Sequence, residues 1–128
     1  MFSSLPPLIL GAAVGATGRW LLGLALGKLL ASPDTGLLAA NWTGAFLIGI
    51  AAALGDWFPQ LPPYWKLLFI TGFLGSLTTF SGFSLEVVQQ LQAQRYAAAL
   101  STAALHLFGS LALTALGMAT VNSLRKLF

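Results

Sequence analysis

The run Gly75-Ser-Leu-Thr-Thr-Phe-Ser-Gly-Phe-Ser84 interrupts a long apolar segment, Leu67 to Gln94, in which Glu86 is the only charged residue. Serine and threonine side chains compete for backbone hydrogen bonds and glycine adds backbone freedom, so a helix is hardest to keep intact here. Irregular backbone at bilayer depth persists only where protein buries it or where it lines a polar cavity. We therefore expect a helix that is broken mid-membrane and lines a path for an ion or solute.

The composition indicates an all-α integral membrane protein. Of 128 residues, 57% are hydrophobic and only 7% are charged, and the mean hydropathy is +0.84. Soluble domains carry about 25% charged residues. The length allows about four spans of roughly 20 residues each, which we assign to one membrane domain covering the whole chain. The expected spans are 6–30, 36–55, 64–94 and 96–124.

Several classes of function are excluded. The three acids and the single histidine are widely separated and no phosphate-binding glycine motif follows a strand, so we expect no enzyme. The net charge of +3 comes from scattered residues without a basic stripe, so we expect no nucleic-acid partner. The surroundings expected for such a chain are membrane lipid.

The basic residues near the predicted span ends are almost evenly divided between the two sides. Lys66, Arg125 and Lys126 lie on one side, and Lys28 and Arg95 lie on the other. So small a difference does not fix an orientation under the positive-inside rule. Either the span ends are slightly misplaced, or the chain inserts in both orientations, which would permit an antiparallel dimer.

Oligomerisation is the simplest expectation, because four short helices enclose little space and polar groups within them need partners. Small residues at helical spacing can let helices approach closely, although glycine is also common in membrane helices generally. They are Gly11, Gly15, Gly18, Gly44, Gly109 and Gly117. A turn at Ser32-Pro-Asp34 is expected between the first two spans.

Three uncharged residues inside the spans each have two interpretations. The amide of Asn41 either makes a structural contact between helices or donates to an anion in a pore. Phe80 and Phe83 share a helix face, which is either a packing or lipid surface or a source of positive ring edges for a small anion.

A line of polar residues runs along the fourth span, where His106, Ser110 and Thr114 are spaced by four. Three aligned polar residues indicate a polar track, although each hydroxyl alone could bond back to its own helix. His106 is either a proton carrier or a packing residue. As the only histidine, it also argues against a multi-histidine metal site.

Two charged residues lie within spans. Glu86 is either a solvated residue at the polar end of its helix or part of a vestibule beyond Phe83. Arg19 has no nearby acid in the sequence. It is either functional, as intramembrane charges often are, or it snorkels or pairs with a carbonyl.

Three stretches together resemble the Fluc family of small fluoride channels. They read Gly-Ala-Ala-Val-Gly-Ala-Thr-Gly-Arg at 11–19, Asn-Trp-Thr-Gly-Ala-Phe-Leu-Ile-Gly at 41–49, and Thr-Gly-Phe-Leu-Gly-Ser-Leu-Thr-Thr-Phe-Ser-Gly-Phe-Ser at 71–84. The Thr-Thr-Phe-Ser core of the third agrees with the family's signature. The first begins with Gly-Ala where a double glycine is common.

The resemblance implies a dual-topology homodimer in a bacterial inner membrane, with two antiparallel pores that pass fluoride passively and reject chloride. It implies that such a channel exports fluoride and protects the cell from it. By residue match, Asn41 would be a pore-lining donor, and Phe80 and Phe83 would supply aromatic edges. Ser110 and Thr114 would form the polar track that faces those rings.

The resemblance also implies a structural sodium ion at the dimer dyad, bound by backbone carbonyls of Gly75 and Thr78. Hydroxyls of Thr79 and Ser81 would help to replace the water that fluoride sheds. The resemblance does not decide between the two interpretations of Arg19, Glu86 or His106.

Two other functions suit a chain of this size and composition. A small proton-coupled exporter of the multidrug type needs an ionisable coupling residue at the midplane, usually a carboxylate. Here the first span has none, and Glu86 lies toward a helix end. A non-transporting subunit of a larger complex would leave the Thr-Thr-Phe-Ser stretch unexplained.

Overall fold

The computed structural model is helical and describes residues 1–30, 32 and 34–128. Among these residues, four helical segments are long and apolar enough to cross a membrane, which confirms the number of long apolar helices that the sequence predicts. The first two are α1 (Leu5–Leu30), preceded by the short turn η1 (Phe2–Ser4), and α2 (Asp34–Trp57). The third comprises α3 (Pro63–Trp65), η2 (Lys66–Leu74), α4 (Gly75–Leu77) and α5 (Phe80–Gln92). The fourth comprises α6 (Tyr96–Ala104), η3 (Leu105–Gly109) and α7 (Ser110–Leu127).

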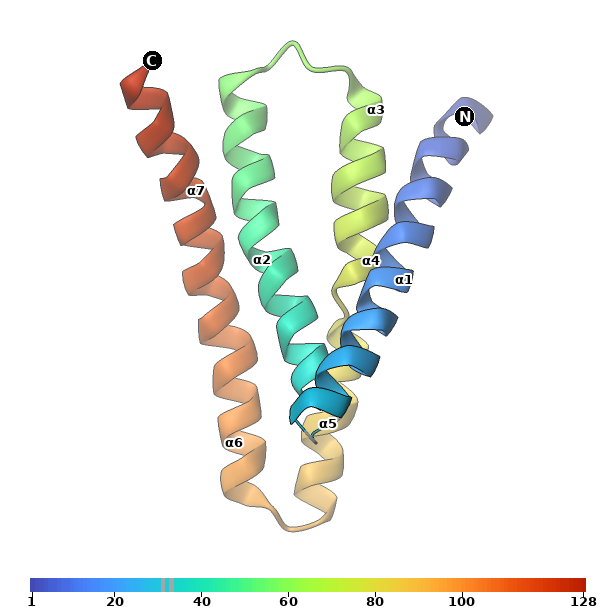
Figure 1. Ribbon diagram of the computed structural model, residues 1–128, viewed down its shortest axis with the longest axis vertical. Helices are drawn as coiled ribbons and strands as arrows, with labels where there is room; N and C mark the ends of the chain where they lie inside the picture. Colours follow the sequence, from blue (N-terminus) through green and yellow to red (C-terminus); the bar gives the residue numbers. More distant parts are fainter. Residues whose placement is uncertain (31, 33) are drawn as a thin grey trace.

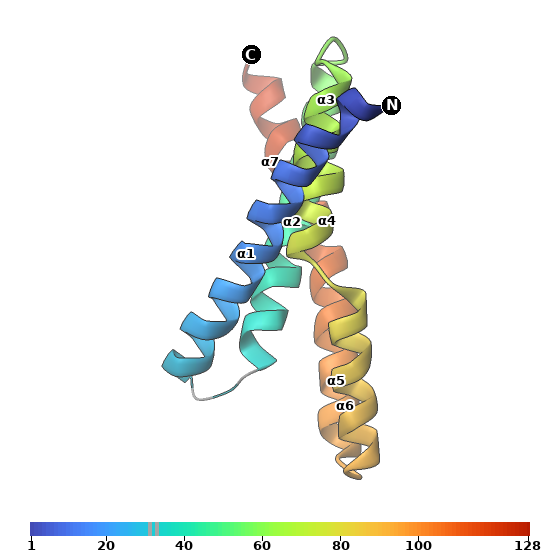
Figure 2. The same ribbon diagram turned by 90° about the vertical axis from the view of Figure 1, so that its right-hand side faces the viewer.

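The four segments run up and down. Both termini lie at one end of the molecule together with the turn between α2 and α3, and the turn between α5 and α6 lies at the other end (Figure 1). Figure 2 shows that the third segment changes direction after α4, so that α5 leaves α1 and runs beside α6. Below α4, the pair α5 and α6 therefore diverges from the pair α1 and α2.

The segment ends differ from the predicted ones by a few residues. The third segment ends at Gln92, before the expected 94, because the chain closes a Schellman turn there. Arg95 N–H donates to the Gln90 carbonyl at 2.9 Å, Gln94 N–H donates to the Leu91 carbonyl at 3.0 Å, and Gln94 has a φ of 60°. In the predicted turn at 32–34, Pro33 lies outside the described residues and Asp34 already begins α2.

Glycines bring the helix backbones together, as the small-residue pattern predicted. A Cβ at Gly11 would overlap the Leu68 carbonyl, and one at Gly15 would overlap the Phe73 carbonyl, so α1 lies directly on η2. Between α2 and α7, a Cβ at Gly117 would overlap the Phe46 carbonyl. On α2, a Cβ at Gly49 would likewise overlap the Thr114 carbonyl of α7. The close packing at Gly49 was not predicted.

The remaining predicted glycines differ in kind. Gly44 faces the Thr78 methyl group and Gly109 faces the Trp42 ring, so each makes room for a side chain. Gly18 has only an ordinary contact with the Leu77 side chain, so within one chain it brings no second backbone close.

The buried core is small and consists mainly of small residues. One cluster contains Ala40, Leu74 and Leu77, where α2 meets the third segment. Large apolar side chains lie mostly on the outside, such as Leu100, Phe108 and Leu111. An apolar exterior of this extent suits lipid or another protein surface rather than water.

Candidate functional site

The third segment is interrupted between α4 and α5. Thr78 (φ −90°, ψ 154°) and Thr79 (φ −149°, ψ 119°) have extended backbones, and the chain becomes helical again at Phe80. The Thr79 hydroxyl accepts a hydrogen bond from Gly82 N–H at 3.1 Å, which caps the N-terminus of α5. The interruption lies within the Ser/Thr-rich run at 75–84, where the sequence predicts it.

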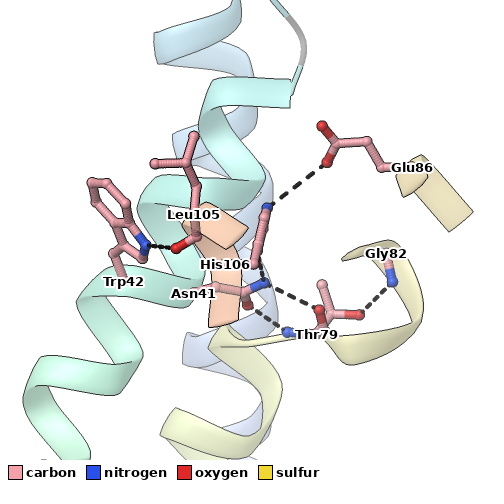
Figure 3. A network of polar contacts seen from close by, with 7 residues as sticks. All are labelled: Asn41, Trp42, Thr79, Gly82, Glu86, Leu105 and His106. Atoms are coloured by element: carbon pink, nitrogen blue, oxygen red, sulfur yellow. Dashed lines mark hydrogen bonds and ion pairs between the residues drawn. The ribbon is translucent and has the colours of Figure 1, made fainter. Parts of the chain in front are cut away.

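Asn41 on α2 binds both backbone groups of Thr79 (Figure 3). Thr79 N–H donates to Asn41 Oδ1 at 2.9 Å, and Asn41 Nδ2 donates to the Thr79 carbonyl at 3.2 Å. These two bonds replace helical bonds that the extended backbone cannot make. The structural-contact interpretation of Asn41 is therefore confirmed.

The interruption also removes the helical partners of other carbonyls. In a continuous helix, Thr79 N–H would donate to the Gly75 carbonyl, and Gly82 N–H would donate to the Thr78 carbonyl. Both N–H groups instead donate to side chains, to Asn41 Oδ1 and Thr79 Oγ1. The carbonyls of Gly75 and Thr78 thus lose their α-helical donors. Carbonyl oxygens without such donors are ligands of the kind that hard cations prefer.

Arg19 supplies a donor for a further carbonyl at the end of α4. Its Nε donates to the Ser76 carbonyl at 3.1 Å. Of the alternatives for Arg19, pairing with a carbonyl is therefore confirmed. Since the donor comes from α1, the guanidinium also joins α1 to the interruption.

An open groove of about 480 Å³ follows the interruption and brings together most of the predicted site residues. It is otherwise lined by apolar side chains, so the polar groups in it are few and localised. The predicted residues that line it are Asn41, Gly75, Thr78, Thr79, Phe80, Phe83, His106, Ser110 and Thr114. Ser81, Arg19 and Glu86 are not among its lining residues.

The two phenylalanines share one face of α5, as their spacing predicted. Their ring centroids are 5.5 Å apart with an interplanar angle of 64°, an edge-to-face arrangement. The Phe80 side chain is largely exposed at the groove, whereas Phe83 lies against the His106 ring at 4.8 Å. Their role toward an anion stays a prediction.

The line His106, Ser110 and Thr114 lies along the groove, although η3 is wound as a π-helix at its start. The Thr114 hydroxyl donates to the Ala45 carbonyl on α2 at 2.9 Å, so its proton already joins two helices. The described residues supply no hydrogen-bond partner for the Ser110 hydroxyl. Beside the interruption, the hydroxyls of Thr79 and Ser81 lie 3.0 Å apart and share one hydrogen bond.

His106 is buried between α2 and α5 and packs there, as one of its two interpretations required. Its Nδ1 lies 3.1 Å from Asn41 Nδ2, and its Nε2 lies 3.9 Å from Glu86 Oε2. The Glu86 side chain is only 12% exposed, so the interpretation of Glu86 as a solvated residue is wrong. Figure 3 shows Glu86, His106, Asn41 and Thr79 as one connected series.

Trp42 contributes a contact that the sequence argument missed. Its indole Nε1–H donates to the Leu105 carbonyl at 3.0 Å, at the start of the π-wound η3 (Figure 3). The ring fits because Gly109 has no Cβ there. The available signal was an indole N–H directly after Asn41, which needs a partner in apolar surroundings. Trp42 thereby joins α2 to the turn that carries His106.

Comparison with known proteins assigns the family. A sequence profile described as "CrcB-like protein, Camphor Resistance (CrcB)" matches residues 7–118. The chain belongs to the CrcB-like family. Curated relatives named "Fluoride-specific ion channel FluC" cover nearly the full chain. One from Chromohalobacter salexigens is 55% identical over 99% of this chain and 96% of its own length. One from Neisseria meningitidis is 60% identical over 92% and 94%, and one from Tolumonas auensis is 49% identical over 98% and 99%.

Asn41→Leu tests the clamp on Thr79. The substitution leaves Thr79 N–H and C=O without their partners, and each unsatisfied buried group costs about 1–3 kcal/mol. We expect a lower free energy of unfolding by about that amount or more, measured by chemical or thermal unfolding in detergent. Asn122→Leu is the matched control, because Asn122 is exposed near the end of α7. Equal losses in the two variants would contradict the clamp.

Proposed function

We propose that this chain is a fluoride-selective channel that passes fluoride passively down its electrochemical gradient. The observation that carries the proposal is the near full-length identity of 49%, 55% and 60% to relatives named fluoride-specific ion channels. The groove beside the interruption supports it, because donors and ring edges lie along one open path. In a bacterial inner membrane, such a channel would export fluoride from the cytoplasm and confer fluoride resistance.

The physical task of the groove is to replace the water that fluoride holds tightly. Hydroxyls of Ser110 and Thr79 and the amide of Asn41 are the hydrogen-bond donors in the groove, Thr114 extends the polar line, and the Ser81 hydroxyl stands behind that of Thr79. The positive edges of Phe80 and Phe83 add weak attraction without a full charge. Conduction needs binding that is favourable yet quickly reversed, and weak contacts of this kind meet that requirement.

The decisive experiment is efflux of fluoride, compared with chloride, from liposomes that contain the purified chain. We expect rapid fluoride efflux that needs no pH gradient and little chloride efflux. Phe80→Ile and Phe83→Ile should each slow fluoride about tenfold, because about 1.4 kcal/mol lost at a barrier slows passage by that factor.

Phe108→Ile is the matched control for these variants, since Phe108 is exposed on η3 and does not line the groove. It should leave the flux unchanged. Full flux in both ring variants would refute the aromatic-edge account. Efflux that required a proton gradient would favour the exporter instead.

The functional unit that we propose is an antiparallel homodimer with two pores. The open groove supports this arrangement, because a single chain leaves one wall of it missing and leaves Phe80 exposed. The two sides of the spans carry nearly equal numbers of basic residues, which agrees with insertion in both orientations. A second copy would close the groove and cover the apolar face around it.

Single cysteines test the dual orientation cleanly, because the chain has none of its own. Gln60→Cys lies in the turn between α2 and α3, and Gln92→Cys lies at the opposite end of the molecule. With a membrane-impermeant maleimide on intact cells, we expect about half of the copies to react at either position. Complete labelling of one position and none of the other would show a single orientation.

The same dimer would carry a structural sodium ion. The carbonyls of Gly75 and Thr78 support this assignment, since their helical donors bind elsewhere. One copy offers too few oxygens for a cation, but antiparallel pairing would bring two interruptions together and double the number. The ion would then join the two copies at their shared axis.

Sodium should stabilise the dimer when it replaces a large organic cation at equal ionic strength. Binding to the folded state alone gives about 2.7 kcal/mol at a hundredfold excess over the dissociation constant. Thermal unfolding of the detergent-solubilised dimer in sodium chloride, compared with N-methylglucamine chloride, measures this difference. Identical unfolding curves at high sodium would argue against the site.

A further inference from the structure

His106 lies at the centre of a series of side chains that joins three parts of the molecule. Its side chain is 6% exposed and lies between Asn41 on α2 and Glu86 on α5, with the Phe83 ring against it. Asn41 in turn binds the backbone of Thr79. The imidazole is therefore one residue removed from the interruption in the third segment (Figure 3).

The hydrogen bonds of Asn41 determine which imidazole nitrogen carries the proton. Thr79 N–H needs an acceptor and the Thr79 carbonyl needs a donor, which fixes Asn41 Oδ1 toward the former and Nδ2 toward the latter. Nδ2 has one hydrogen left, and His106 Nδ1 lies 3.1 Å from Nδ2. Nδ1 must then be an acceptor, so the ring is neutral with its hydrogen on Nε2, facing Glu86.

We propose that His106, as a neutral imidazole, is a positioning residue that holds the Asn41 amide in place, so that ion passage requires an unprotonated Nδ1. The inference rests on the proposed channel function. Asn41 links the imidazole to Thr79, and the same ring packs on Phe83. A change in the protonation state of the ring would therefore affect two residues that line the groove.

Protonation of His106 would be incompatible with one of its two polar neighbours and favourable for the other. A hydrogen on Nδ1 would face the Asn41 NH₂ group, which places two donors together without an acceptor. Rotating the amide does not solve this, because Nδ2 would then face Thr79 N–H. Glu86 Oε2, 3.9 Å from Nε2, instead favours the charged ring. Asn41 must therefore leave either His106 or Thr79 when the ring becomes charged.

The charged groups around His106 are few. Glu86 on α5 faces its Nε2, and α2 carries Asp34 at its start and Asp56 near its end. The elements α6, η3 and α7 contain no acidic residue. Arg19 on α1 is engaged with the Ser76 carbonyl. The imidazole and its neighbour Glu86 are thus the titratable pair of this region.

Fluoride current through planar bilayers at symmetrical pH tests the proposal, because the neutral acid carries no current. The wild-type current should fall about tenfold between about pH 8, where an imidazole is neutral, and about pH 4, which lies well below the range in which an ordinary imidazole becomes protonated. Glu86→Gln should still lose current in acid, since the imidazole remains.

Two variants of the histidine separate positioning from simple packing. His106→Gln keeps an acceptor for Asn41 but does not titrate, so it should conduct at high pH and lose the fall in acid. His106→Leu offers no acceptor and should conduct poorly at every pH, although it elutes as a folded dimer in size-exclusion chromatography.

The outcomes are distinguishable. A wild-type current that is flat or rises toward acid overturns the proposal while leaving the channel function intact, and this measurement needs no variant to fold. A His106→Gln channel that loses current in acid as steeply as wild type also overturns it. Absence of fluoride current in the wild type at every pH overturns the channel function itself.

Discussion

The pair of hydrogen bonds between Asn41 and the Thr79 backbone is the interaction on which the rest of this structure depends. An apolar helix interrupted within a bundle has backbone donors and acceptors with no water to bind, and each unsatisfied group is costly. Asn41 provides one acceptor and one donor in the spacing that an extended residue needs. Without this pair of bonds, a helix that continued through Thr78 and Thr79 would have a lower free energy than the interrupted one. The amide therefore stabilises a local conformation that the apolar surroundings oppose.

The interruption also determines what the neighbouring residues do. Once Thr79 N–H turns to Asn41 and Gly82 N–H turns to the Thr79 hydroxyl, carbonyls at the end of α4 lack donors. Arg19 satisfies that of Ser76 from α1. The carbonyls of Gly75 and Thr78 remain for a cation, if the proposed dimer forms. Arg19 thus meets a shortage of backbone donors and needs no carboxylate partner.

Periodicity and composition were enough to predict the four segments, the run in which the third one is interrupted, and the close packing at Gly11, Gly15 and Gly117. These features depend on local properties of the chain. The contacts between Asn41, His106 and Glu86 were not predictable in the same way, because Asn41 and His106 are 65 positions apart and their hydrogen bond depends on side-chain direction. The contact of Trp42 was not predictable for a similar reason. Its partner is a backbone carbonyl in a π-wound turn, and no residue type in the sequence indicates where such a turn lies.

The donors along the groove are mostly engaged already, which bears on how an anion would pass. The Thr114 hydroxyl donates to Ala45, and Thr79 and Ser81 share a bond. An anion that recruits such a donor must replace an existing acceptor, so the net gain is the difference between two hydrogen bonds rather than a whole one. A free donor in an apolar groove would bind a dehydrated halide strongly and release it slowly. A groove of engaged donors exchanges one acceptor for another, which keeps each binding step shallow and allows the ion to leave.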